Sequence, residues 1–532
     1  MNKKVTITGI CLLGIFSLLA VRIGYLQLVR GEKLSEDAAN QRWTEVLNQG
    51  NRGNITDRHF FSMTNAGEQW LAVVTPAEVE NNDALYRQLA PFCSWTASEF
   101  QQKLAKNQIF TVPLTEEPDF SVTEGLETVV TNKRYDFNSP ASHLLGYCNG
   151  GEGVSGLEAA YDTVLAMGGG ISVGAVTDAS GKIITDLSSH ESPEQERNLR
   201  LTIDATLQNV IEETGKKEIP QGAAVLLDLH TSDILAMASF PDFDQSDISK
   251  AVSSSDGSMV NRALCAYDAG SVFKIIVAAA ALEHGEDLGW YTCNGSVSVG
   301  DMSVSGYHHI AHGDLTLPEA FAKSCNCYFI TLGQKLGAEK ILDMAEKFGI
   351  GTPYHLFKNS GEQKDSAGEK EDYFEGELAN LSIGQGQVML TPLRVAEFSA
   401  IVASGGIRHK VNLVHSVTDG NQKTIKKISS FKQERVISKE TAEFLKSMMV
   451  MTTLSGTAQT LSLDSIGGAG CKTGTAQTGW SEGETTKVHS WITGFFPAEH
   501  PKYALCIFVE NGENNGISAS HVFEKIIKKI KK

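Results

Sequence analysis

Apolar positions dominate the first 30 residues. After Lys3 and Lys4, an apolar run extends to Val21, and a second run follows Arg22. The first run alone barely reaches the ~20 residues that a bilayer span needs, but the second run lengthens it if the Arg22 side chain snorkels to the membrane surface. Because no small-residue cleavage site follows Arg30, we expect an uncleaved anchor with its N-terminus inside the cell and the remaining chain outside.

From Leu199 onward the apolar pattern changes to short runs separated by turns or by helical stretches. Ala223–Asp228 and Ile234–Ser239 flank a polar turn and predict a β-hairpin. Three further strands are expected near the C-terminus, at Lys472–Ala476, Ser490–Phe496 and Tyr503–Val509. Helical patterns lie between the two groups. The predicted fold is therefore α+β, with helices flanking an antiparallel sheet built from both ends of the domain.

Residues 31–198 mix strand-like runs such as Trp70–Val74 with polar helical stretches such as Ser98–Lys106. No nucleophile motif occurs there, so we expect a spacer or docking domain. A glycine run at Gly168–Gly170 and a polar stretch punctuate its end. The predicted parts are a cytoplasmic tip and transmembrane anchor (1–30), an N-terminal pedestal (31–198) and a catalytic domain (199–532).

Composition narrows the classes of partner. The chain has 532 residues, 41% hydrophobic and 20% charged, with a formal net charge of −17. This acidic balance argues against a nucleic-acid partner. We expect no cofactor.

Nine cysteines, an odd number, do not suggest a full disulfide framework. Several zinc-type ligands nevertheless fall in one short stretch, and they are Cys293, His308, His309, His312, Cys325 and Cys327. Their spacing matches no standard zinc finger. Buried free thiols are the favoured explanation and no metal is assigned, but whether Cys293, His312 and Cys325 bind one stays open.

Ser271 and Lys274 form an S-x-x-K pattern directly before the apolar stretch Ile275–Leu282. Residues three apart share one helix face, so the hydroxyl and the amine can serve as nucleophile and base. A second S-x-x-K, Ser429 to Lys432, lies in a charged run and is interpreted as a solvated segment.

Two further motifs follow in order. Ser324-Cys325-Asn326 gives S-x-N, and Lys472-Thr473-Gly474, followed by Thr475, gives K-T-G on a predicted strand. Together with S-x-x-K they form the signature of penicillin-binding proteins and class A β-lactamases.

The chain resembles the class B penicillin-binding proteins, membrane-anchored transpeptidases with a serine β-lactamase/transpeptidase-like catalytic domain. Arg52–Arg58 is similar to the family's membrane-proximal R-G-x-I-x-D-R motif, and Thr202–Asp204 to the entry of its catalytic domain. The pedestal between about 60 and 130 matches little, and Ser232 stands where the family's hairpin turn often has glycine.

The resemblance implies the following roles. Ser271 would attack the penultimate D-alanine carbonyl of a peptidoglycan stem peptide, and Lys274 would accept its proton. Ser324 would relay a proton to the leaving amine. The substrate-binding residues would be Asn326 for the peptide amide and Lys472, Thr473, Gly474 and Thr475 around the terminal carboxylate. β-Lactam antibiotics would acylate the same serine.

A membrane glycan polymerase of the shape, elongation, division and sporulation type is the expected partner. Arg52, Asp57 and Arg58 would either meet it or fold the base of the pedestal. Two alternatives stay open: a D,D-carboxypeptidase or β-lactamase sharing the site, and a non-enzymatic scaffold of a wall-synthesis complex.

Overall fold

The structure is a computed structural model that describes residues 3–28, 30, 43–47, 52–119, 125–137, 139–149, 151–167, 171–176, 188–191, 196–305, 309–369, 373–482 and 485–531. The chain divides into two compact units. The larger unit comprises Gly53–Ala66, Arg134–Ala166 and Glu196–Lys532, and the smaller one the remaining segments. Two segments of the predicted pedestal thus group with the larger unit. The predicted domain boundaries stay a prediction.

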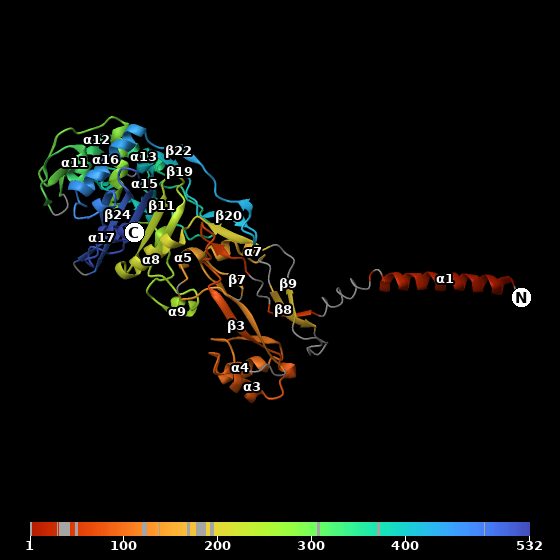
Figure 1. Cartoon of the computed structure of the whole chain (residues 1–532). Helices are drawn as coiled ribbons and strands as arrows, with labels where there is room; N and C mark the ends of the chain where they lie inside the picture. Colours follow the sequence, from red (N-terminus) through yellow and green to blue (C-terminus); the bar gives the residue numbers. More distant parts are fainter. Residues whose placement is uncertain are drawn as a thin grey trace. The chain divides into compact units, whose positions relative to one another are not determined.

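The larger unit is built on a five-stranded antiparallel sheet (Figure 1). Its order is β12-β11-β25-β24-β23, so the C-terminal strands continue the N-terminal hairpin. The five strands are β11 (Gly222–Asp228), β12 (Ile234–Phe240), β23 (Gly470–Glu482), β24 (Thr485–Phe496) and β25 (Tyr503–Val509). The predicted α+β architecture, with strands from both ends of the domain, is confirmed.

Alternation along β25 shows how the sheet is covered on both faces. Leu505 and Ile507 pack with apolar residues of α8 (Ala205–Glu218) and α17 (Ala519–Ile530). Cys506 and Phe508 belong to the opposite core, with residues of α10 (Lys274–Glu283), α15 (Pro392–Ala403) and α16 (Lys439–Ser455). Successive side chains of a strand point to opposite faces, so a continuous apolar run here means a sheet buried on both sides.

The core on the Cys506 and Phe508 side of the sheet contains most of the helices of this unit. They are α10 (Lys274–Glu283), α11 (Leu317–Ala322), α12 (Asn326–Leu336), α13 (Ala338–Lys347), α14 (Glu375–Ser382), α15 (Pro392–Ala403) and α16 (Lys439–Ser455). Every residue of α10 from Lys274 to Ala281 is buried, as the apolar stretch after Lys274 predicts for the helix.

A smaller sheet in the same unit has the order β2-β10-β20-β21. The strands are β2 (Ile55–Thr56), β10 (Asn198–Leu201), β20 (Val414–Thr418) and β21 (Thr424–Lys427). Strand β2 pairs in parallel with β10. The Arg52–Arg58 motif therefore contains a short strand, which belongs to the larger unit.

Ser232, in the turn between β11 and β12, has a φ of 52°. Glycine adopts this left-handed conformation without the Cβ penalty, whereas serine does so at a cost. The turn geometry explains why glycine suits this position in the family.

The smaller unit contains a sheet of order β4-β3-β5. Its elements are β3 (Gly67–Val74), β4 (Phe110–Pro113), β5 (Leu126–Lys133), α3 (Asn82–Leu89) and α4 (Ala97–Leu104). The strand expected at Trp70–Val74 and the helix expected near Ser98 are both present. Helix α4 begins with a capping box of Thr96 and Glu99.

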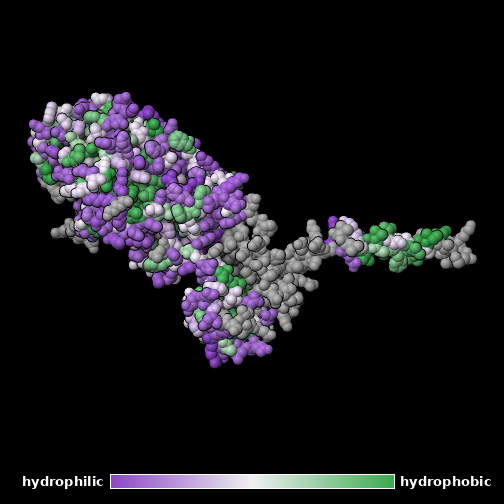
Figure 2. All heavy atoms as spheres, in the orientation of Figure 1, coloured by the Kyte–Doolittle hydropathy of each residue, from purple (hydrophilic) through white to green (hydrophobic). Residues whose placement is uncertain are grey.

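The N-terminal element is the helix α1 (Lys3–Leu28). Hydrophobic residues gather along it, as Figure 2 shows, and Leu13, Phe16 and Leu18 are each more than 60% exposed. Within the described ranges, no helix reaches the combination of length and hydropathy required to cross a membrane.

Candidate active site

The S-x-x-K motif spans the junction between a 3-10 turn and the α-helix that follows it. Ser271 belongs to the turn Gly270–Phe273, and α10 begins at Lys274. Gly270 has a φ of 58°, and its N–H donates to the Gly384 carbonyl (2.7 Å). A Cβ at Gly270 would lie 2.6 Å from the Thr475 carbonyl oxygen. Glycine is required here because the backbone turns left-handed against the neighbouring strand.

Lys274 is fully buried and reaches the second motif. Its Nζ donates to the Ser324 carbonyl (2.8 Å) and to Oδ1 of Asn326 (2.6 Å), and lies 3.2 Å from Ser324 Oγ. Burial, reinforced by the positive charge of nearby Lys472, holds the pKa of Lys274 well below its usual range. A neutral amine can accept a proton, as the base role requires.

Lys472 approaches Ser324 from strand β23. Its Nζ donates to Ser324 Oγ (2.9 Å) and to the Thr473 carbonyl (2.8 Å). The side chain is 0% exposed, and burial lowers the pKa of Lys472 to about 7. Ser324 Oγ thus lies between two amines, and this arrangement allows proton movement through the hydroxyl.

The walls of the site form a cleft of about 500 Å³. Predicted site residues among its lining are Ser271, Ser324, Asn326, Thr473, Gly474 and Thr475. Lys472 is not among them. Alternation along β23 turns Thr473 and Thr475 toward the cleft, and Lys472 toward the interior. A direct contact of Lys472 with a substrate carboxylate therefore stays a prediction, whereas its hydrogen bond to Ser324 is observed.

Gly474 packs closely against the turn that carries Ser271, and Ser324 has an unusual backbone conformation. A Cβ at Gly474 would lie 2.9 Å from Cγ1 of Val272, in the turn that carries the nucleophile. Ser324 has a φ of 56°, a left-handed conformation that serine adopts only when its surroundings hold it.

Sequence reasoning missed one wall of the cleft. Ser455, Gly456 and Thr457, at the C-terminal end of α16, line it, and Oγ1 of Thr457 lies 2.5 Å from Oγ1 of Thr473. The only signal was a short run of small polar residues after a helix. The second S-x-x-K lies elsewhere: Ser429 and Lys432 fall between β21 and β22 (Gln433–Arg435), with Lys432 exposed, as expected of a solvated segment.

A serine at a tight turn, followed by a buried amine with a lowered pKa, defines an enzyme that transfers acyl groups through serine. The family model for the penicillin binding protein transpeptidase domain matches residues 222–528, and the chain belongs to this family. The predicted assignment to the class B penicillin-binding proteins is confirmed.

Relatives extend the likeness beyond that domain. Stage V sporulation protein D of Bacillus subtilis (strain 168) is 30% identical over 528 residues, covering 93% of this chain and 80% of the relative. The peptidoglycan D,D-transpeptidase PbpA of Mycobacterium tuberculosis (strain H37Rv) is 31% identical over 346 residues, covering 58% and 67%. The solved penicillin G acyl-enzyme complex of penicillin-binding protein A from M. tuberculosis is 26% identical with a TM-score of 0.63, covering 75% of this chain and 94% of that one.

Proposed function

We propose that this chain cross-links peptidoglycan as a serine D,D-transpeptidase. Ser271 Oγ attacks the penultimate D-alanine carbonyl of a stem peptide, an ester forms, the amide bond breaks and terminal D-alanine leaves. An amine of a second stem peptide then attacks the ester, forms the cross-link and regenerates the serine. The two buried amines on Ser324 Oγ, Lys274 at 3.2 Å and Lys472 at 2.9 Å, are the observation that carries this mechanism.

The buried amines supply the proton path. Ser271 lies in the 3-10 turn, and Lys274 is the first residue of α10, directly after that turn. When neutral, the Lys274 amine accepts the serine proton. Ser324 passes a proton to the departing D-alanine nitrogen. Lys472 restores the Ser324 proton, since a pKa of about 7 makes its proton available at neutral pH.

Substrate binding falls to the cleft walls. The Asn326 amide group faces the stem-peptide backbone, with its Oδ1 already engaged by Lys274. Thr473 and Thr475 offer hydroxyls to the terminal carboxylate. The backbone N–H groups of Ser271 and Thr475 hold the developing oxyanion, and each such donor contributes about 2.7–4 kcal/mol in well-studied enzymes.

Fluorescent-penicillin labelling of the full-length protein tests the acylation step. Ser271→Ala should abolish labelling, while Ser429→Ala, the matched change in the second S-x-x-K, should leave it unchanged. Incubation with lipid-linked stem peptides distinguishes the reaction class, because cross-linked dimers identify a transpeptidase and release of D-alanine alone identifies a carboxypeptidase. Labelling that persists in Ser271→Ala would refute the assigned nucleophile.

The proposal places the enzyme at the cell membrane, anchored by α1, with the catalytic unit on the outer face. Support comes from the apolar sequence of the helix, its exposed side chains and the two lysines at its N-terminal end. Stem peptides for cross-linking lie outside the membrane, so the orientation suits the substrate.

A membrane glycan polymerase of the shape, elongation, division and sporulation type is the proposed partner. Holding both enzymes together raises the local concentration of newly made strands. Within the Arg52–Arg58 motif, Asp57 serves the fold, since its Oδ1 accepts from the backbone N–H groups of His59 (2.7 Å) and Phe61 (2.9 Å). The Arg58 side chain is partly exposed and Phe61 is 66% exposed, so this turn offers both charge and apolar surface to a neighbour.

Co-purification with the polymerase tests the docking turn. Arg58→Glu and Phe61→Ala should each reduce the recovered polymerase while penicillin labelling is retained. Lys426→Glu, the same charge reversal on exposed β21, is the control and should change neither readout. Loss of labelling together with co-purification would show that Arg58 serves the fold.

A further inference from the structure

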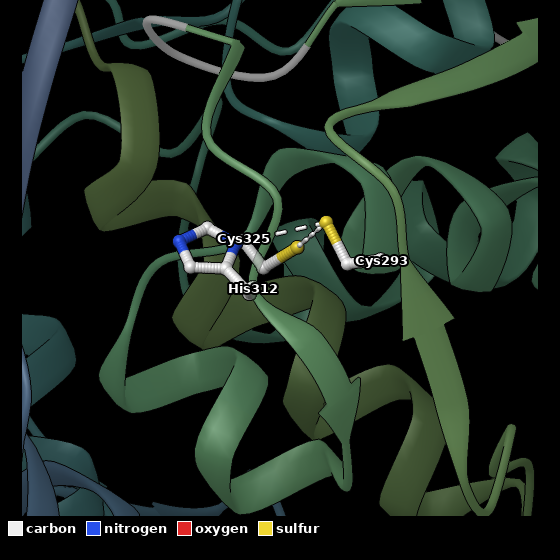
Figure 3. Close-up of side chains that lie close together, drawn as sticks. All are labelled: Cys293, His312 and Cys325. Carbon is white, nitrogen blue, oxygen red and sulfur yellow. Dashed lines mark hydrogen bonds between the residues drawn. The ribbon is translucent and has the colours of Figure 1, made fainter.

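Cys293, His312 and Cys325 converge beside the active site from three separate elements (Figure 3). Cys293 ends β14 (Tyr291–Cys293), and its ladder partner is Gly313, the first residue of β17 (Gly313–Leu315). His312 directly precedes that partner. Cys325 is the residue immediately before α12. The antiparallel pairing of β14 with β17 therefore brings the histidine to the first thiol, and α12 supplies the second.

The distances match a metal site better than a disulfide. Cys293 Sγ lies 3.5 Å from Cys325 Sγ and 3.7 Å from His312 Nδ1. A disulfide requires about 2.05 Å between sulfurs. Tetrahedral zinc, with bonds of about 2.3 Å to sulfur and about 2.0–2.1 Å to nitrogen, places its ligand atoms roughly 3.5–3.8 Å apart. All three ligand atoms lie within 4.8 Å of one another.

Burial and ligand type also favour a metal. Cys293 and Cys325 are each 1% exposed, whereas His312 is partly exposed and lines the cleft with Cys325. Among the common divalent ions, zinc is the one that binds thiolate and imidazole ligands in this combination. Among the described residues, Cys327 is not part of this group of three ligand atoms. His308 lies outside the described residues.

From this geometry we infer a site for a divalent metal ion, with zinc the expected metal, formed by Cys293 Sγ, His312 Nδ1 and Cys325 Sγ. The sequence alone favoured buried thiols. The convergence of the three side chains points instead to a metal ion.

The metal would affect catalysis by holding active-site residues in place. Cys325 is the middle residue of the S-x-N motif, between Ser324, with its left-handed backbone, and Asn326. A metal on Cys325 would fix this turn to β14 and β17, and so hold the two partners of Lys274 in place. Its ligands are positioning residues and need not touch the substrate.

Metal analysis of the full-length chain, purified in detergent without chelators and dialysed against buffer containing trace zinc, tests the site. Wild type should retain about one zinc per chain by elemental mass spectrometry. Cys293→Ser and His312→Ala should each retain less than a tenth of that amount. Cobalt(II) replacement in wild type should give the intense near-ultraviolet thiolate-to-metal band, and Cys293→Ser should lack it.

Two matched variants serve as controls. His309→Ala removes an exposed histidine from the same segment, and Cys93→Ser removes a free thiol from the smaller unit. Both should keep the full metal content. Equal loss in His309→Ala would indicate binding by surface histidines and would overturn the site.

A measurement on wild type alone covers the case in which a variant does not fold. A high-affinity chelator should lower its Tm and slow its acylation by penicillin at least several-fold, and added zinc should restore both. Wild type that holds no zinc after dialysis, or that shows a Cys293–Cys325 disulfide by mass spectrometry, would refute the proposal. Penicillin labelling at Ser271 is scored separately, so the metal site and the enzyme assignment can fail independently.

Discussion

Lys274 donates a 2.6 Å hydrogen bond from its Nζ to Oδ1 of Asn326. The asparagine of the S-x-N motif therefore orients the base, in addition to the substrate contact expected from the family resemblance. Its Oδ1 is committed to the lysine, which leaves the Nδ2 hydrogens for a peptide carbonyl. One side chain thus links the substrate to the group that activates the nucleophile.

Replacing Asn326 should slow acylation without abolishing it. Asn326→Ala removes a hydrogen bond of about 1–3 kcal/mol, so we expect a fall of roughly 10- to 100-fold in the second-order rate of penicillin acylation. Asn326→Asp should be slow at pH 7 and recover partly at higher pH, because the new carboxylate raises the pKa of Lys274 and keeps the amine protonated. Stopped-flow measurement of both variants across pH checks this, and an unchanged rate in Asn326→Ala would contradict the orienting role.

Burial of Lys472 predicts a specific dependence of stability on pH. Its folded pKa of about 7 is below the unfolded value of ~10.4. Between these values the unfolded chain binds more protons, so the free energy of unfolding rises with pH, by at most about 1.4 kcal/mol per pH unit from this group. Below pH 7 both states are protonated and the burial penalty is complete.

Lys472→Met, which keeps most of the side-chain volume, should flatten that slope. The measurement compares denaturant unfolding of wild type and variant from pH 7 to pH 10, since the difference isolates Lys472 from other titrating groups. The variant should also acylate more slowly, because Ser324 Oγ loses a donor. Identical slopes in the two proteins would show that burial does not disfavour the charged form of Lys472.

Gly270→Ala should remove acylation while Gly289→Ala preserves it. Both glycines have a positive φ (58° and 61°), so each alanine meets a similar backbone penalty of about 1–2 kcal/mol. Only at Gly270 would the new Cβ approach another chain segment, 2.6 Å from the Thr475 carbonyl, whereas Gly289 faces open space. Penicillin labelling and thermal unfolding of both variants separate the two effects. A comparable loss of labelling in Gly289→Ala would mean that backbone strain alone is responsible.

The N-terminal helix should resist extraction from membranes. Because α1 exposes large apolar side chains along its length, we expect the protein to stay in the pellet after alkaline carbonate treatment. The mature protein should retain Lys3 and Lys4. Release by carbonate, or a mature N-terminus near Gly31, would contradict the uncleaved anchor.

Local patterns predicted the parts of this protein that depend on neighbours in sequence. The apolar run after Lys274 identified a buried helix, and the five strands of the main sheet appeared as apolar or motif-bearing stretches. The junction at Ser271 was predicted less well, because the change from a 3-10 turn to an α-helix depends on Gly270 packing against β23.

Long-range geometry accounts for what the sequence left open. The burial of Lys472 depends on which face of β23 turns inward, and pairing with β24 sets that face. Thr457 reaches the cleft only because α16 ends beside Thr473. The convergence of Cys293, His312 and Cys325 likewise needs the β14–β17 register, which no spacing in the sequence reveals.

The place of β25 in the main sheet has a consequence for biosynthesis. This strand is the last of the five to leave the ribosome, yet it lies between β11 and β24 in the middle of the sheet. Strand β11 pairs at once with β12, but its second partner, β25, lies beyond the whole of the intervening helical region, and β23 joins the N-terminal hairpin only through β24 and β25. Lys472 and the threonines of β23 can be set against Ser271 only after nearly the entire polypeptide has been made, so a nascent or truncated chain has no working catalytic centre.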